Sequence, residues 1–218
     1  MIEVQVFIVT GGYSGVGYEL VQILYRKHAT IYVAGRSKEK AELAIKEIKG
    51  AVPSSQGVLK FLYLDLNDLT TIKPAVNEFL RQEQRLDVLW NNAGVMVPPT
   101  GSKTKQGYEM QLGSNSLAHF LLSRLLLPIM KETAKSAPKD SVRLCFAGSL
   151  VVEFPLPEGV IDFDDINLEK SDSQSLKYGQ SKAANVLLGS EFAQRHGQSG
   201  VVSVVSIERV LTNGGGVS

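Results

Sequence analysis

A tyrosine and a lysine stand four residues apart in Tyr178-Gly-Gln-Ser-Lys182, within a segment with a helical pattern. Side chains at i and i+4 lie on the same face of a helix, so the phenol and the ammonium point the same way. A free tyrosine has a pKa near ~10, and a cation within a few ångströms favours the phenolate and lowers that value. Such a pair can exchange a proton with a carbonyl or its alcohol. Alone, the spacing is also typical of two unrelated surface residues.

A serine adds to this pair. Ser149 lies just past the apolar run Val142–Ala147, which we predict to be a strand. In α/β proteins the carboxyl ends of parallel strands form the ligand-binding edge of the sheet. A hydroxyl at that edge could hydrogen-bond the carbonyl oxygen that Tyr178 protonates, or it could be an ordinary turn serine. The candidate catalytic residues are therefore Ser149, Tyr178 and Lys182.

A glycine-rich turn with Gly11, Gly15 and Gly17 lies between the β-branched run Val4–Val9 and the amphipathic segment Tyr18–His28. In a strand–turn–helix unit these glycines permit, in order, a sharp turn, close approach of N–H groups to a pyrophosphate, and close packing of helix on strand. The phosphates would meet the positive end of the helix. The unit predicts nucleotide binding, although glycine-rich turns also occur as simple connections between elements that bind no ligand. The spacing is a variant of the usual motif, because three residues, instead of one, separate the first two glycines. No lysine follows the third glycine, which argues against a nucleoside triphosphatase loop.

The end of the second strand candidate indicates which nucleotide would bind. An acid there accepts a hydrogen bond from the adenosine ribose 2′-hydroxyl and selects NAD, whereas an arginine can pair with a 2′-phosphate. Here Arg36 follows Ala34-Gly35, with Ser37 beside it. NADP(H) is therefore favoured over NAD(H), and a solvated arginine that opens a helix is the alternative. Asp65, at the end of the third strand candidate, could accept from the adenine amino group or cap a local turn.

Strand and helix patterns alternate along the whole chain. Continuously apolar strands in such an alternation predict an α/β fold with a doubly wound parallel sheet of about six strands, helices on both faces, and one domain over residues 1–218. The strands expected after the first are Thr30–Ala34, Leu59–Leu64, Val88–Trp90, Val142–Ala147 and Val201–Ile207. The helices expected after the first are Lys38–Lys49, Leu69–Glu83, Tyr108–Lys135 and Leu176–Arg195.

Composition argues against several classes of function. The chain of 218 residues has 23 basic and 22 acidic side chains and a net charge of +1, which gives no sign of a nucleic-acid or membrane surface. The single cysteine, Cys145, lies in an apolar run and is interpreted as a buried core residue of a protein from a reducing compartment. The histidines lack metal-ligand spacing, and no apolar run approaches the ~20 residues of a membrane span. We expect a soluble, cytoplasmic protein without a metal site.

Taken in order, the motifs resemble those of the short-chain dehydrogenase/reductase superfamily, most closely the branch that holds retinol dehydrogenases and protochlorophyllide reductases. The likeness covers almost the whole chain and rests on Thr10-Gly-x-x-x-Gly-x-Gly17, Asn91-Asn-Ala-Gly94, Asn115-Ser-Leu-Ala-His-Phe-Leu-Leu122, Ser149 and Tyr178-x-x-x-Lys182. It implies a Rossmann-type fold and reversible hydride transfer between a nicotinamide and a carbonyl or alcohol carbon of a small-molecule substrate.

The resemblance also implies a role for each residue. Tyr178 would be the proton donor and acceptor, Lys182 would lower its pKa and hold the nicotinamide ribose, and Ser149 would orient the carbonyl. Asn115 would be the fourth catalytic residue, supporting a proton-relay water, or it could instead hydrogen-bond inside its helix and kink it. Asn92 would line the cofactor pocket, or it could simply end a strand. The candidate cofactor-binding residues are Gly11, Tyr13, Ser14, Gly15, Val16, Gly17, Arg36, Asp65, Leu66, Asn92, Ala93, Gly94, Tyr178, Lys182 and Thr212.

The pattern of the family is broken near the C-terminal end of the sequence. The family has Pro-Gly after the sixth strand, facing the nicotinamide, where this chain has Ile207–Thr212 without a glycine. Glu208 would put a negative charge near the cofactor amide, while Thr212 matches a position that can contact it. Relatives continue through helices that cover the substrate and through a further strand. We therefore expect this chain to lack the lid and the last strand, with weakened turnover and an exposed sheet edge.

Two functions are compatible with these features. The first is an NADP(H)-dependent oxidoreductase that interconverts a carbonyl and an alcohol, favoured because the whole acid–base set is present. The second is a catalytically impaired NADP(H)-binding or interaction protein that keeps the fold, favoured by the altered C-terminal end. The long helices around Asn115 and Tyr178 could pair in a homodimer, although members of this branch can be monomeric.

Overall fold

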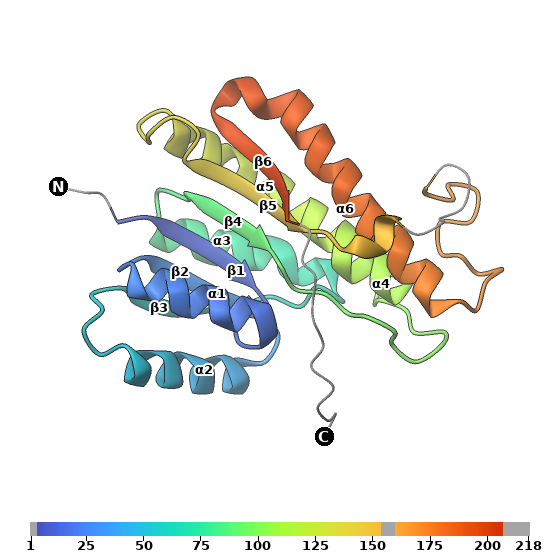
Figure 1. Cartoon of the computed structure of the whole chain (residues 1–218), viewed down its shortest axis with the longest axis horizontal. Helices are drawn as coiled ribbons and strands as arrows, with labels where there is room; N and C mark the ends of the chain where they lie inside the picture. The colour runs from blue at the N-terminus through green and yellow to red at the C-terminus, as the bar shows by residue number, and fades with distance from the viewer. Residues whose placement is uncertain (1–3, 154–159, 207–218) are drawn as a thin grey trace.

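Six parallel strands form one sheet in the computed structural model, which describes residues 4–153 and 160–206 (Figure 1). The strand order is β3-β2-β1-β4-β5-β6, so the direction of winding reverses between β1 and β4. This is the doubly wound sheet that the alternating pattern predicted, and it is of the Rossmann type that the family resemblance implied. The strands are β1 (Val6–Thr10), β2 (Thr30–Gly35), β3 (Val58–Tyr63), β4 (Val88–Asn91), β5 (Val142–Ala147) and β6 (Val201–Ser206).

The central strands β1 and β4 are apolar up to their last residues, Thr10 and Asn91, because both faces of the sheet are covered. All five residues of β1 are buried, and successive side chains enter different cores. Val6 and Ile8 pack in the larger core, whereas Phe7 and Val9 pack in the smaller one. A strand between two helix layers has no solvent face, which explains why the sequence of β1 shows no polar alternation.

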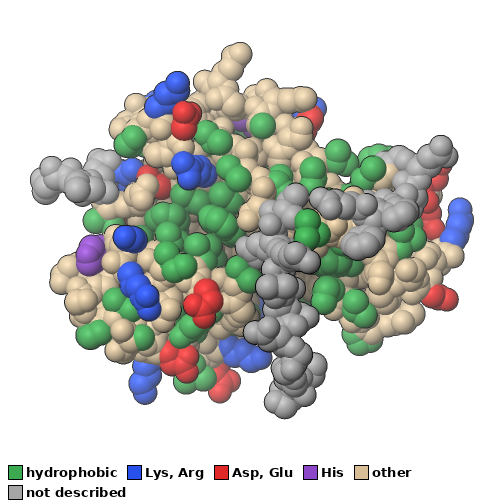
Figure 2. Space-filling model, in the orientation of Figure 1, with side chains coloured by type: hydrophobic (Ala, Val, Ile, Leu, Met, Phe, Trp, Pro, Cys, Tyr) green, Lys and Arg blue, Asp and Glu red, His purple; other side chains and the backbone are tan. Residues whose placement is uncertain are grey.

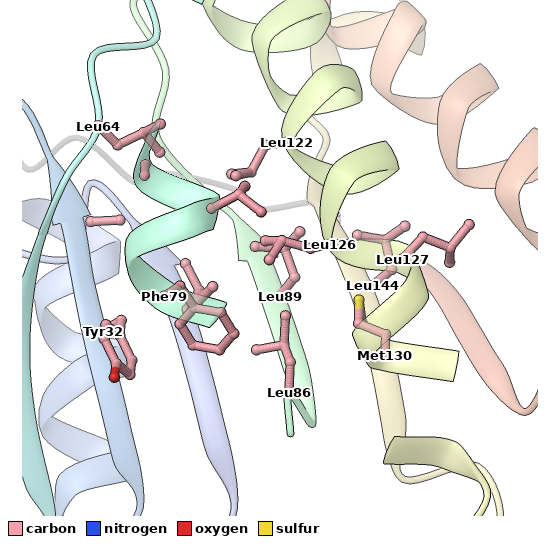
Figure 3. Packing of buried hydrophobic residues seen from close by; sticks show 14 of the residues in the cluster. Tyr32, Leu64, Phe79, Leu86, Leu89, Leu122, Leu126, Leu127, Met130 and Leu144 are labelled. Carbon is pink, nitrogen blue, oxygen red and sulfur yellow. The ribbon is translucent and has the colours of Figure 1, made fainter. Parts of the chain in front are cut away.

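The helices form one layer on each face of the sheet (Figure 1). The smaller core lies under α1 (Gly15–Arg26) and α2 (Lys38–Ala51). The larger core lies under α3 (Ile72–Gln82), α5 (Ala118–Ala134) and α6 (Gln174–His196). Figure 3 shows this larger core, in which side chains of α3 and α5 close over those of β4. The prediction of helices on both faces is therefore confirmed.

Aromatic packing fixes α3 on the sheet. The ring of Phe79 meets the ring of Tyr32 edge to face, with centroids 4.9 Å apart, and both residues are fully buried (Figure 3). Burial of two such rings contributes several kcal/mol, roughly 1.5–3 kcal/mol per side chain. The same contact holds Tyr32, the third residue of β2, under α3.

The single cysteine is a core residue, as predicted. Cys145 of β5 is 3% exposed and packs in the smaller core. Burial raises the pKa of its thiol to about 11, because the thiolate cannot be solvated there. The side chain therefore has a packing role.

The predicted helix Tyr108–Lys135 is interrupted. The structure has a short α4 (Met110–Leu112), a π-helical turn over Gly113–Leu117, and then α5. The carboxylate of Glu109 accepts a hydrogen bond from the Leu112 N–H at 2.8 Å and so caps α4. A π-turn inserts an extra residue into the helix and releases backbone groups from the regular ladder. Periodicity in a sequence cannot show such an insertion, because the apolar stripe continues across it.

Other predicted boundaries shift by a few residues. α1 begins at Gly15 and not at Tyr18, because Ser14 is its N-cap. The segment before α3 is a 3-10 turn capped by Asp68, whose carboxylate accepts from the Thr70 N–H at 3.0 Å. β6 is described as far as Ser206, and the predicted features at 207–212, including Thr212, lie outside the described residues.

Charged side chains are mixed on the face shown in Figure 2, where lysines and arginines are interspersed with acids among the described residues. In the part of the chain that the structure describes, no helix is both long and apolar enough to cross a membrane. In the same part, no group of three or more His, Cys, Asp or Glu side chains could hold a metal ion.

Candidate functional site

A cleft of about 690 Å³ opens along the carboxyl edge of the sheet. It spans the reversal point between β1 and β4, where doubly wound sheets bind ligands. Most of the predicted site residues line it together, although they come from separate parts of the sequence. They are Gly11, Tyr13, Ser14, Val16, Arg36, Asp65, Leu66, Asn92, Ala93, Gly94, Ser149, Tyr178 and Lys182.

The glycine turn has the geometry of a phosphate cradle. Gly11 and Gly15 adopt φ of +65° and +54°, which side-chain-bearing residues rarely do. A Cβ on Gly15 would meet nothing within 4 Å, whereas one on Gly17 would lie 2.5 Å from Gly11 O and 2.6 Å from Asn92 Nδ2. Ser14 makes no side-chain capping bond, so its hydroxyl leaves the first N–H groups of α1 to other partners. An anion such as a pyrophosphate fits this arrangement.

Hydrogen bonds that Thr10 accepts connect the end of β1 to the loop after β4. The Thr10 hydroxyl accepts from the backbone N–H groups of Asn92 and Ala93, both at 2.9 Å. The Asn92 side-chain amide donates to Thr10 O, also at 2.9 Å. Asn92 therefore lines the cleft and also braces it. Thr10 was missed as a functional residue, although a buried polar residue at a strand end is a signal for such a role.

The end of β2 has no space for a side chain at position 35. A Cβ on Gly35 would lie 2.3 Å from Cε1 and 2.9 Å from the hydroxyl oxygen of Tyr13. The ring of Tyr13 thus covers the position where an acid would select NAD. Arg36, the next residue, lines the cleft beside it. Asp65 also lines the cleft, and its carboxylate accepts from the Asn67 N–H at 3.0 Å, so it does form the predicted local turn.

Three of the four predicted catalytic side chains meet at one end of the cleft, and the fourth, Asn115, is described below. Tyr178 is half-buried and is hydrogen-bonded by Ser149. The ammonium of Lys182 lies 5.7 Å from the centroid of the Tyr178 ring, and it donates to Ala147 O at 3.0 Å. Lys182 itself is 5% exposed. A phenol, a hydroxyl and an ammonium are therefore within one small volume.

The pKa of Tyr178 differs from the expectation. We expected the lysine to lower it, but the pKa is raised, because burial disfavours the phenolate more than the Ser149 hydrogen bond favours it. The ammonium, at 5.7 Å from the ring centroid, does not reverse this balance. The phenol is thus held protonated at neutral pH.

Asn115 lies behind the cleft wall. It is fully buried in the π-turn, and its amide bonds outside its own helix. The amide oxygen accepts from Val95 N at 2.8 Å, while the amide nitrogen donates to Val95 O and to Ser181 Oγ, both at 3.0 Å. The helix is distorted at Asn115, as one of the two alternatives predicted. The Asn115 side chain, however, makes its hydrogen bonds to Val95 and Ser181 and not within its own helix. The amide supports the loop that follows Gly94.

Two more polar residues belong to this buried group and were not predicted. The imidazole of His119 is fully buried between Thr10 and Asn115. The hydroxyl of Ser181 links the Asn115 amide to Tyr178 O, to which it donates at 2.8 Å. The sequence did contain a signal for His119 and Ser181, because each is a polar residue at a helix position that should face the core.

Comparison with known proteins assigns a class to this fold and site. A model of the short chain dehydrogenase family matches residues 5–138. The chain therefore belongs to the short-chain dehydrogenase/reductase family, as its motifs indicated. It is 51% identical over 202 residues to a short-chain dehydrogenase/reductase of Phomopsis amygdali, covering 92% of this chain and 60% of the relative. It is 41% identical over 199 residues to mouse (Mus musculus) retinol dehydrogenase 11, covering 91% of this chain and 59% of the relative. The chain thus spans about 60% of the length of these relatives.

Solved structures confirm the fold. The Pseudomonas aeruginosa RhlG/NADP complex superposes with a TM-score of 0.73 and 22% identity, over 94% of this chain and 72% of that one. A metagenomic short-chain oxidoreductase in complex with NADP gives a TM-score of 0.70 and 24% identity, over 93% of this chain and 80% of that one.

Gly17→Ala should damage the cleft, because its Cβ would have to push apart Gly11 O and the Asn92 amide. We expect a loss of at least ~1 kcal/mol in the free energy of unfolding and weaker nucleotide binding. Gly50→Ala in α2 is the matched control, since nothing lies within 4 Å of its Cβ, and it should be neutral or stabilising by up to ~1 kcal/mol. Urea unfolding measures both, and equal behaviour of the two variants would contradict the packing argument.

Proposed function

We propose that the chain is an NADP(H)-dependent oxidoreductase that interconverts a carbonyl and an alcohol. The observation that carries the proposal is the meeting of Ser149, Tyr178 and Lys182 at one end of a cleft whose other end is the glycine turn. Family membership supports oxidoreductase chemistry in general. The residues at the cleft fit a dinucleotide, because the cradle at Gly15 and the first turn of α1 leave N–H groups for phosphates.

The nicotinamide, when bound, supplies or accepts the hydride. The acid–base step belongs to Tyr178, whose phenol donates its proton to the substrate oxygen during reduction. Its raised pKa suits this direction, because the phenol is protonated at neutral pH. Ser149 holds the phenol by a hydrogen bond and is placed to bond the same substrate oxygen. Lys182 places a positive charge close to where negative charge develops.

The preference for NADP(H) is supported by the end of β2. Arg36 offers a guanidinium to a 2′-phosphate, while the Tyr13 ring leaves no room for an acid at position 35. Two structurally similar proteins are described as complexes with NADP. In the same proposal, residues 1–218 are one nucleotide-binding domain of a cytoplasmic protein that acts on a small molecule, and a homodimer forms through the long helices.

A second candidate is an NADP(H)-binding protein with little catalysis. The specific observation in its favour is the raised pKa of Tyr178, because alcohol oxidation needs the phenolate. Binding of NADPH without turnover on any carbonyl or alcohol would favour this candidate over the enzyme.

Tyr178→Phe should lower kcat/KM for carbonyl reduction by roughly 10²–10⁴-fold, because the proton donor is removed. NADPH oxidation against a panel of carbonyls measures this, and NADPH fluorescence measures binding, which should fall far less. Tyr25→Phe is the matched control, since Tyr25 is buried in the smaller core outside the cleft. Equal rates for wild type and Tyr178→Phe would remove Tyr178 from the mechanism.

Ser149→Ala should raise the pKa of Tyr178 further, because the hydrogen bond that lowers it is lost. The phenolate then forms only at higher pH, so the rise of alcohol oxidation with pH should move to higher pH. The pH profile of kcat/KM with NADP⁺ measures this shift, and Ser149→Thr, which keeps a hydroxyl, should restore part of it. A shift to lower pH in Ser149→Ala would contradict the assignment.

Gly35→Asp should weaken NADPH binding about tenfold or more, because the carboxylate repels the 2′-phosphate and its Cβ meets the Tyr13 ring. NADH binding should improve only in Tyr13→Ser/Gly35→Asp, in which the ring no longer occupies that space. Fluorescence titration with both nucleotides tests this, with Tyr13→Ser alone as the control. A gain of NADH affinity in Gly35→Asp that is as large as in the double variant would show that the ring is not the obstacle.

A further inference from the structure

A buried histidine at the start of α5 has both of its ring nitrogens engaged. In His119, Nδ1 lies 2.9 Å from Asn115 O and Nε2 lies 3.0 Å from Thr10 Oγ1. A carbonyl oxygen can only accept, so Nδ1 carries the proton and Nε2 accepts from the Thr10 hydroxyl. Burial lowers the pKa of His119 to about 4, which keeps the ring in this neutral form.

On one side the ring reaches the nucleotide-binding part of the cleft. The Thr10 hydroxyl donates a hydrogen bond to His119 Nε2 at 3.0 Å and accepts hydrogen bonds from Asn92 N and Ala93 N, each at 2.9 Å. The hydroxyl also lies 3.3 Å from Trp90 O, but the shorter distance favours the imidazole as the acceptor. Thr10 thus connects the ring to Asn92 and Ala93, two of the residues that line the cleft after β4.

On the other side the ring reaches the acid–base helix. The backbone carbonyl of Asn115 lies in the π-turn and accepts from the imidazole, while the amide of the same residue donates to Ser181 Oγ at 3.0 Å. Ser181 in turn donates to Tyr178 O at 2.8 Å. Thr10, His119, Asn115 and Ser181 are all fully buried, so no solvent competes for these bonds.

We propose that His119 is a positioning residue whose neutral imidazole joins the nucleotide-binding turn at Thr10 to the acid–base helix through Asn115. The donors run in one direction, from Asn92 N–H through Thr10, His119 and Asn115 to Ser181, and the last bond ends on the backbone of Tyr178. In this proposal, the series of hydrogen bonds sets the distance between the glycine turn at one end of the cleft and the Tyr178 phenol at the other. The inference rests on the proposed function.

Two substitutions separate the two halves of the connection. His119→Asn places an amide near the Nδ1 position, so it can keep the Asn115 bond and loses Thr10. We expect NADPH affinity to fall about tenfold, more than kcat does. His119→Gln reaches the Nε2 position and loses Asn115, so kcat should fall roughly 10- to 100-fold, more than NADPH affinity does. Equal losses of affinity and kcat in both variants, in step with their Tm, would reduce His119 to a core packing residue.

A double-mutant cycle on NADPH binding tests the connection without turnover. Thr10→Val should weaken binding about tenfold, Thr10→Ser should recover most of that loss, and Thr10→Val/His119→Asn should be no weaker than the poorer single variant. Thr133→Val is the matched control: this buried threonine of α5 accepts from Leu86 N at 2.9 Å, so Tm should fall and NADPH affinity should not.

Additive losses in the cycle would overturn the inference. If the wild type binds NADPH but turns over no substrate, the catalytic part of the proposed function fails, and the cycle still decides whether Thr10 and His119 act together.

Discussion

The site depends on how closely the end of β1 approaches both α1 and the loop after β4. Gly17 allows this approach, because any side chain there would collide with Gly11 O and the Asn92 amide. The end of β1 and the loop are then held together by Thr10, whose hydroxyl and carbonyl both accept hydrogen bonds from the loop. The cleft of about 690 Å³ is thus built beside a contact that leaves no space for a side chain at position 17. Rigid packing at the base is what allows polar groups at the rim to stay in place.

The end of the cleft that contains Tyr178 depends on a balance of two effects on the pKa of the phenol. Burial raises the pKa of Tyr178 and the Ser149 hydrogen bond lowers it, and burial is the larger of the two. Lys182 is held by Ala147 O at the end of β5, so its charge is directed by the sheet as well as by its own helix. The protonation state of the phenol therefore depends on how much of its ring the surrounding elements cover, and not only on its spacing from the lysine.

Local patterns were enough to predict the strands, the helix layers and most of the cleft. The apolar run of β1 is a strand buried on both faces of the sheet, and the glycine turn has a defined place between β1 and α1. A kink at Asn115 was one of two predicted alternatives, but its π-helical form could not be predicted, since an inserted residue leaves the apolar stripe nearly unchanged. The His119 connection was also hidden, because it joins β1 to α5, which are distant in sequence. The pKa of Tyr178 was predicted in the wrong direction, because sequence spacing carries no information on burial.

The burial of the Cys145 thiol matters for chemical labelling of the protein. It is the single cysteine of the chain, and its thiol is both enclosed in the smaller core and hard to ionise. Alkylating reagents and peroxide attack the thiolate, so they should pass over this residue in the folded protein. A cysteine introduced at the rim of the cleft would then be the sole reactive one, and a dye or spin label attached to it would report on that position alone.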